Sequence, residues 1–259
     1  MNKATKVFYT KVLIFVLVIA LVIVGIVVLK NKNKSEHKEV SSGQNASVEI
    51  TAKKEKEPET VTLGDYTLNA EFSNLLLVNG ENPLPDDYDY EGNLIEIDSK
   101  YIGGSLTQFD KDVYPYLVAM IENAKKDGVS LRVWSPYRSY AIQKMLFDKQ
   151  VNREIAKGTP AGKPAEDAAA TVVARPGTSE HHTGLALDIN MADDAFENTK
   201  EFNWLSEHAA EYGFILRYPK SKQDKTGVIY ESWHYRFVGI NEAKKIKASG
   251  LCLEEYLKK

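Results

Sequence analysis

The 259-residue sequence has little cysteine, little histidine and almost no excess of charge of either sign. Its single cysteine, Cys252, excludes an internal disulfide bond and any metal cage built from several thiolates. The 33 basic and 36 acidic residues leave a formal net charge of −3, which argues against a nucleic-acid partner, since such proteins usually carry a basic stripe. The apolar share of 43% excludes wholesale disorder, so we expect a folded protein.

Charged and polar side chains are missing from one long segment near the N-terminus, VLIFVLVIALVIVGIVVL at residues 12–29. As a helix it would reach about 27 Å, close to the hydrocarbon thickness of a bilayer. A cleaved signal peptide is the alternative, but its apolar region is usually shorter and ends at a small-residue cleavage site, which this sequence lacks. We therefore expect a short cytoplasmic tail over 1–11 and one transmembrane anchor over 12–30.

Aromatic residues are absent from the next segment, residues 31–62, which is rich in lysine, glutamate, serine and asparagine. Such a composition buries too little apolar surface to offset chain entropy, so we expect a flexible linker. Lysines flank the anchor on both sides, and the positive-inside rule does not decide its orientation. The simplest arrangement is single-pass, with the domain over 63–259 outside the cell membrane and facing the cell wall.

Helices and short strands alternate irregularly along residues 63–259. Apolar spacing and capping residues predict helices over 113–126, 140–157, 164–174 and 202–212. Short apolar or alternating runs predict strands over 75–78, 131–134, 185–189 and 233–238. Because there is no regular strand–helix–strand rhythm, we expect an α+β fold, a small antiparallel sheet with flanking helices.

Three of the five histidines fall in two short clusters, SEHHTGLALD at residues 179–188 and ESWHY at residues 231–235. Two imidazoles and one carboxylate are a common zinc-binding set that leaves one position for water. A further carboxylate must then take the proton of that water, and Glu231, three residues before His234, is suited to the role. The clusters therefore predict a hydrolytic zinc site.

The same residues resemble the VanY-like D-alanyl-D-alanine carboxypeptidases, a family of zinc enzymes that trim peptidoglycan. The family pattern S-x-H-x-x-G-x-A-x-D is matched in full over residues 179–188, and the later E-x-W-H is matched over 231–234. A tyrosine-arginine-serine turn followed by a glutamine is matched by Tyr137, Arg138, Ser139 and Gln143. The resemblance extends over roughly residues 73–240.

The resemblance implies one zinc ion per chain, and it implies hydrolysis of the C-terminal D-alanine of peptidoglycan stem peptides. It assigns a role to each matched residue: His181, Asp188 and His234 as metal ligands, Glu231 as general base, Arg138 as the cation that polarises the scissile carbonyl, and Ser179, Gln143 and Tyr137 as substrate contacts. No protein partner is indicated.

Two local points remain open at this stage. In a regular strand over 182–188, side-chain parity would place His182 on the face of Asp188, whereas the motif selects His181. The two agree only if the chain turns between His181 and Gly184, so we expect His181, with His182 as the alternative. Pro136 stands where the family pattern has a small residue, which could alter how Arg138 is presented. His208 is expected on a helix surface.

Other functions are compatible with the same zinc site. An L,D-carboxypeptidase or a peptidoglycan endopeptidase would need only a differently shaped groove. A non-catalytic wall-binding receptor would be favoured by loss of the base or of a ligand, and this sequence retains all four residues. A tethered domain without metal would leave the clustering of scarce histidines unexplained.

Overall fold

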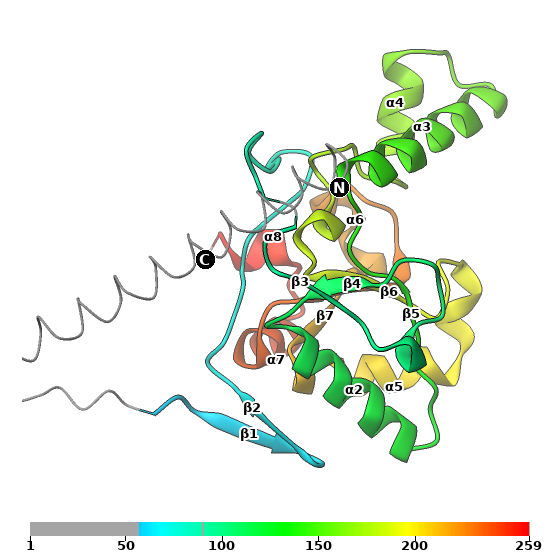
Figure 1. Cartoon of the computed structure of the whole chain (residues 1–259). Coiled ribbons are helices and arrows are strands. Elements are labelled where there is room, and N and C mark those ends of the chain that lie inside the picture. Colours follow the sequence, from blue (N-terminus) through cyan, green and yellow to red (C-terminus); the bar gives the residue numbers. More distant parts are fainter. Residues whose placement is uncertain (1–56, 90, 259) are drawn as a thin grey trace, which may run out of the picture. The chain divides into compact units, whose positions relative to one another are not determined.

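A four-stranded antiparallel sheet lies at the centre of the domain in the computed structural model, which describes residues 57–89 and 91–258 (Figure 1). Its strands are β5 (Val133–Ser135), β6 (Ala186–Ile189), β8 (Glu231–Phe237) and β7 (Phe214–Tyr218), and they lie side by side in that order. Each neighbouring pair is antiparallel. Sequence order and spatial order thus differ, because β8 inserts between β6 and β7.

Two small hairpin sheets stand apart from the central one. The strands β1 (Thr60–Leu63) and β2 (Tyr66–Asn69) pair with each other, and β3 (Leu94–Glu96) pairs with β4 (Gln108–Asp110). The observed architecture is therefore a mixed fold of small antiparallel sheets and helices, which confirms the expected class at this level.

Helices surround the sheet and supply much of the core. Those of one turn or more are α2 (Tyr114–Lys126), α3 (Tyr140–Ala156), α4 (Lys163–Ala170), α5 (Lys200–His208), α6 (Gln223–Thr226), α7 (Ile240–Ser249) and α8 (Leu253–Tyr256). Short 3-10 turns are η1 (Ser99–Tyr101), η2 (Glu180–Thr183), η3 (Asp194–Asn198), η4 (Ala209–Tyr212) and η5 (Lys220–Lys222). Figure 1 shows α2 and α5 along one side of the sheet, with α3 and α4 projecting away together.

The two faces of the sheet differ in chemistry because side chains alternate along each strand. Leu187 and Ile189 of β6, with Tyr235 and Phe237 of β8, belong to the main hydrophobic core together with residues of α2 and α5. The residues between them are polar and also buried: Asp188, His234 and Arg236. One face therefore stabilises the fold, and the other carries charged groups inside the protein.

Local signals predicted most of the helices well. The predicted helix over 113–126 is α2, and it stops at Asp127 as expected. Ser139 caps α3, where its side chain accepts a hydrogen bond from the Ile142 amide. The predicted helices over 164–174 and 202–212 correspond to the shorter α4 and to α5 continued by η4.

The expected strand over 75–78 is wrong. This segment forms no strand in the structure, although its residues are all apolar. The carbonyl oxygens of Asn74 and Leu76 accept hydrogen bonds from the guanidinium of Arg236 instead of from a neighbouring strand. A side chain of β8 thus takes the place that a partner strand would fill.

The N-terminal expectations fall largely on residues that the structure does not describe. The predicted tail over 1–11, anchor over 12–30 and nearly all of the linker lie outside the described residues. β1 begins at Thr60, so the last residues of the predicted linker form a strand, paired with β2. Within residues 57–89 and 91–258, no helix combines the length and the apolar character that crossing a membrane requires.

Candidate metal centre and active site

The pairing register of the sheet brings Asp188 and His234 together. Asp188 of β6 lies directly opposite His234 of β8. Directly opposed residues on one face of an antiparallel pair have Cβ atoms only about 4.5–5.5 Å apart. Two residues that are 46 positions apart in sequence are therefore adjacent, and both are buried.

A turn before β6 supplies the third residue of the cluster. Residues 180–183 form the 3-10 turn η2, which ends at Gly184 with a left-handed φ of 71°. This turn breaks the strand parity that favoured His182, and ligand atoms of His181, Asp188 and His234 all lie within 4.8 Å of one another. His182 points elsewhere, where its Nε2 accepts a hydrogen bond from the Gly177 amide.

Hydrogen bonding selects the tautomer of His181. Its Nδ1 lies 2.8 Å from the carbonyl oxygen of Pro136, which can only accept, so Nδ1 carries the proton. Nε2 then presents a lone pair 3.6 Å from Asp188 Oδ1. Pro136 therefore fixes the tautomer of His181 through its backbone carbonyl oxygen. The small residue of the family pattern would provide the same backbone oxygen, so the proline does not change this contact.

The chemistry of the cluster fits a metal cation. Asp188 is anchored by Arg138, whose Nη2 donates a 2.5 Å hydrogen bond to Oδ2. The other carboxylate oxygen, Oδ1, is buried and accepts no hydrogen bond from the described residues. A buried, unsatisfied carboxylate oxygen is costly unless something compensates it, and a cation between Oδ1 and the two imidazoles would do so.

The pKa shifts of the two imidazoles show where positive charge is favoured. Burial, followed by the charge of Arg138, lowers the pKa of His181 to about 4. Burial also opposes the charged form of His234, but the nearby carboxylates of Asp188 and Glu180 outweigh it and raise its pKa to about 9. The carboxylates around His234 therefore favour positive charge at this ring.

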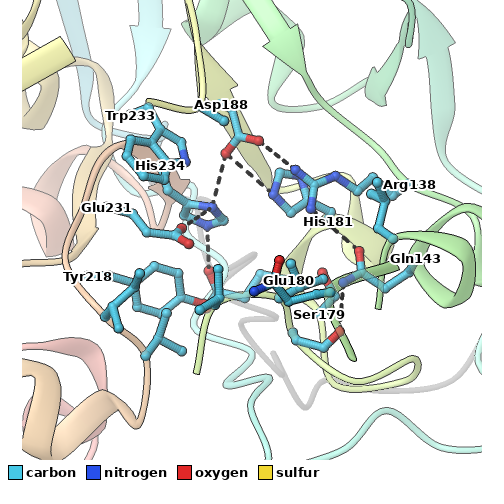
Figure 2. A pocket seen from close by; sticks show the side chains of 18 of the residues that line it. Arg138, Gln143, Ser179, Glu180, His181, Asp188, Tyr218, Glu231, Trp233 and His234 are labelled. Atoms are coloured by element: carbon cyan, nitrogen blue, oxygen red, sulfur yellow. Dashed lines mark hydrogen bonds and ion pairs between the residues drawn. The ribbon is translucent and has the colours of Figure 1, made fainter. Parts of the chain in front are cut away.

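Glu231 lies beside the cluster in a state suited to proton transfer. It begins β8, and its Oε2 is 3.6 Å from His234 Nδ1 (Figure 2). Burial raises the pKa of Glu231 to about 7, although the charge of His234 acts in the opposite direction. A base whose pKa is near the working pH is effective at accepting and returning a proton.

Arg138 is held in place by three neighbours. Nε donates to Ser135 Oγ, Nη2 to Asp188, and Nη1 approaches Gln143 Oε1 at 3.5 Å. Because a guanidinium has five N–H donors, two are left for a substrate oxygen. Gln143 is itself fixed by its hydrogen bond to the carbonyl of Ala174, so it acts here on Arg138.

A cavity of about 480 Å³ opens beside these groups. Its lining includes the three cluster residues, Glu231, Arg138, and the predicted substrate contacts Ser179 and Gln143. Tyr137 is only 5% exposed and does not belong to this lining, so the structure does not place it for substrate contact. His208 lies on the surface of α5 beside Glu207 and Glu211, as expected.

Comparison with known proteins identifies the family. A family model described as VanY, D-alanyl-D-alanine carboxypeptidase, matches residues 106–240, which is more than half of the chain. The chain belongs to the VanY family. A D-alanyl-D-alanine carboxypeptidase of Enterococcus faecalis is 43% identical over 183 residues, an alignment that covers 71% of this chain and 65% of that protein. The present chain thus matches just under two thirds of the length of this VanY relative.

Solved structures agree with the fold. The vancomycin resistance D,D-pentapeptidase VanY from a VanB-type resistance cassette, solved as a variant in complex with Zn(II), is 44% identical with a TM-score of 0.61. That alignment covers 71% of this chain and 98% of that one. The LD-carboxypeptidase LdcB is 38% identical with a TM-score of 0.61, over 71% of this chain and 85% of that one.

Two residues that line the cavity of this VanY member were not predicted from its sequence. Glu180 occupies the variable position of the S-x-H motif and is completely buried beside His234. Tyr218, at the end of β7, places its ring 4.8 Å from that of His234. The position of Glu180 directly before His181 could have indicated that it belongs to the site. Nothing in the local sequence around Tyr218 indicates a place in the cavity.

Proposed function

We propose that this protein is a zinc-dependent D-alanyl-D-alanine carboxypeptidase that removes the C-terminal D-alanine of peptidoglycan stem peptides. The observation that carries the proposal is the convergence of His181, Asp188 and His234 at a cavity that Glu231 and Arg138 also line. Membership of the VanY family and likeness to a VanY structure that holds Zn(II) support it.

Each residue then has a defined task. When bound to the three ligands, zinc activates a water molecule and polarises the peptide carbonyl. Glu231 accepts the proton of the attacking water and returns it to the departing amine. Arg138 directs its two remaining N–H donors toward the carbonyl oxygen as negative charge develops there. Ser179 lines the same cavity and is a candidate contact for the terminal carboxylate of the substrate.

The site is also compatible with L,D-carboxypeptidase activity, because a chain 38% identical is named an LD-carboxypeptidase. Release of D-alanine from synthetic pentapeptide and tetrapeptide stems, measured in parallel on the full chain, separates the two. We expect about one zinc per chain and release from the pentapeptide. Release from the tetrapeptide alone would make it an L,D-enzyme, and zinc without release would indicate an endopeptidase or a receptor.

We further propose that residues 12–30 anchor the protein in the cell membrane with the catalytic domain facing the wall. The uncharged apolar run and the location of the peptidoglycan substrate support this arrangement. Fractionation of cells that express the full chain, followed by protease treatment of intact protoplasts, tests it. The domain should sediment with membranes and be cleaved from outside; recovery in the soluble fraction would refute the anchor.

A further inference from the structure

Behind the candidate metal centre lies a buried group of charged side chains that the proposed reaction does not use. Glu180, Arg217 and Arg236 are each at most 1% exposed. Arg217 comes from β7 and Arg236 from the neighbouring β8, and both point to Glu180 on η2. Burying three charges is expensive, so their arrangement requires a physical explanation.

The two arginines bind the same oxygen of Glu180. Nε of Arg217 donates to Oε1 at 2.7 Å, and Nη1 of Arg236 donates to Oε1 at 2.9 Å. The second oxygen, Oε2, is buried and accepts no hydrogen bond from the described residues. It lies 3.6 Å from Nε2 of His234, which is likewise buried without a hydrogen-bond partner among those residues (Figure 2).

Other donors of both arginines bind groups elsewhere in the chain, which restrains the position of Glu180. Arg217 forms a bidentate pair with Glu254 of α8, at 2.9 and 2.6 Å. Arg236 donates to the backbone carbonyls of Leu76 and Phe237. Contacts with distant parts of the chain therefore fix the position of Oε2, which faces His234.

The other nitrogen of the His234 ring faces the metal centre. Nδ1 lies 3.3 Å from Asp188 Oδ1, the oxygen that belongs to the cluster. To bind a cation through Nδ1, the imidazole must be neutral and carry its proton on Nε2. An acceptor must then be present at Nε2, and a movement of about 0.6 Å would bring Glu180 Oε2 to ordinary hydrogen-bond distance.

We propose that Glu180 is a positioning residue for metal binding: its Oε2 accepts the Nε2 proton of His234 and so holds the tautomer that offers Nδ1 to the metal. Arg217 and Arg236 occupy Oε1 and thereby direct Oε2 at the ring. The inference rests on the zinc assignment in the proposed function, but it concerns metal binding and not peptide cleavage. It is therefore testable without a substrate.

The substitution Glu180→Gln makes a sharp test because an amide has only one acceptor oxygen. Both arginine donors require that oxygen, so the amide NH₂ would face Nε2 of His234 as a donor. The ring would then be driven to the tautomer with its proton on Nδ1, the wrong one for metal binding. Glu254→Gln is the matched control, since it changes the same kind of group on Arg217 without facing His234.

Zinc affinity of the full chain, measured by competition with a chromogenic chelator, distinguishes the variants. We expect Glu180→Gln to weaken zinc binding about 10- to 100-fold, as is typical when a residue that orients a metal ligand is lost. Glu254→Gln should stay within about threefold of the native protein. Unchanged affinity in Glu180→Gln, or an equal loss in both variants, would overturn the proposal.

A second measurement needs no variant. In ¹⁵N spectra of the native, zinc-loaded protein, His234 should carry its proton on Nε2, and that proton should exchange slowly with water. A proton that exchanges as fast as that of an exposed imidazole would overturn the proposal, even if Glu180→Gln fails to fold. Failure of the peptidase proposal would appear instead as zinc binding without release of D-alanine.

Discussion

Asp188 and Glu180 are both buried carboxylates beside His234, but they face different nitrogens of its ring. Each is held by arginine through one oxygen and has its second oxygen unsatisfied. On the cavity side, the free oxygen of Asp188 meets two imidazoles, a geometry that suits a cation. On the arginine side, formed by Glu180, Arg217 and Arg236, the free oxygen meets one imidazole, a geometry that suits a proton.

Under the proposed assignment, the number of converging nitrogens, and not burial, distinguishes the ligand Asp188 from the positioning residue Glu180. For both groups, nearby positive charges hold the pKa well below its usual range despite burial. Both carboxylates line the cavity of about 480 Å³, but Asp188 faces two imidazoles whereas Glu180 faces one. Substitutions on each side of the ring should therefore have different consequences.

The largest effect is expected from Asp188→Asn. Arg138 requires the amide oxygen, so the NH₂ group would point at the two imidazoles and repel a cation. Zinc affinity should fall by more than the roughly 100-fold upper range for a residue that only orients a ligand, and activity should be lost with it. Elemental analysis of the purified variant measures this, and about one zinc per chain would contradict the ligand assignment.

Glu231→Gln should separate chemistry from metal binding. Glu231 lies beside His234 but is not required as a ligand, so zinc should remain while D-alanine release falls by about 10²- to 10⁴-fold. Parallel metal analysis and peptide assays give both quantities. If zinc were lost together with activity, Glu231 would belong among the ligands and not among the bases.

The neighbouring histidines provide a matched pair. His181→Ala should abolish stable zinc binding, whereas His182→Ala should keep it, since the two ring nitrogens of His182 face the Gly177 amide and the Arg138 carbonyl and not the metal cluster. His182→Ala should lower the free energy of unfolding by about 1–3 kcal/mol, because the backbone groups that His182 binds are left unpaired. Retained zinc in His181→Ala would show that the turn η2 does not select the ligand.

The smallest effect concerns Glu254, on the far edge of the arginine side. Burial opposes its ionisation, but hydrogen bonding to Arg217 keeps its pKa below the ordinary value. A depressed pKa contributes stability above the unfolded-state pKa of about 4.3, and this contribution is lost as pH falls through the folded-state pKa. Glu254→Gln should therefore cost about 2 kcal/mol at pH 7 and less near pH 3. Urea unfolding at both pH values tests this, and an equal cost at both would contradict it.

Sequence patterns were sufficient wherever the deciding interaction is local. Ser139 caps the helix that follows it, and α2 ends at Asp127, because both signals act within a few residues. The cluster of His181, Asp188 and His234 was predicted from the spacing of scarce histidines and the family motif. Strand β7 and helix α7 were not predicted, since their apolar patterns are short and are completed only by packing.

Sequence patterns could not predict which buried charged groups interact with one another. Glu180 is 37 residues from Arg217 and 56 from Arg236, and no short-range spacing connects them. The failed strand over 75–78 illustrates the same point, because the carbonyl of Leu76 accepts a hydrogen bond from Arg236, 160 residues away. Tyr137 lies outside the cavity lining because its side chain is buried just before α3, which the local pattern did not indicate.

By itself the sequence determined which residue types gather at the candidate metal centre, where the main helices begin and end, and the family to which the chain belongs. The family motif favoured His181 over His182 against strand parity, and the tertiary structure confirmed that His181 joins the cluster. The tertiary structure alone decided that Arg138 holds Asp188 and that Glu180 faces His234. The physical reason is that these contacts depend on strand register and on the turn at Gly184, which bring together groups far apart in the chain.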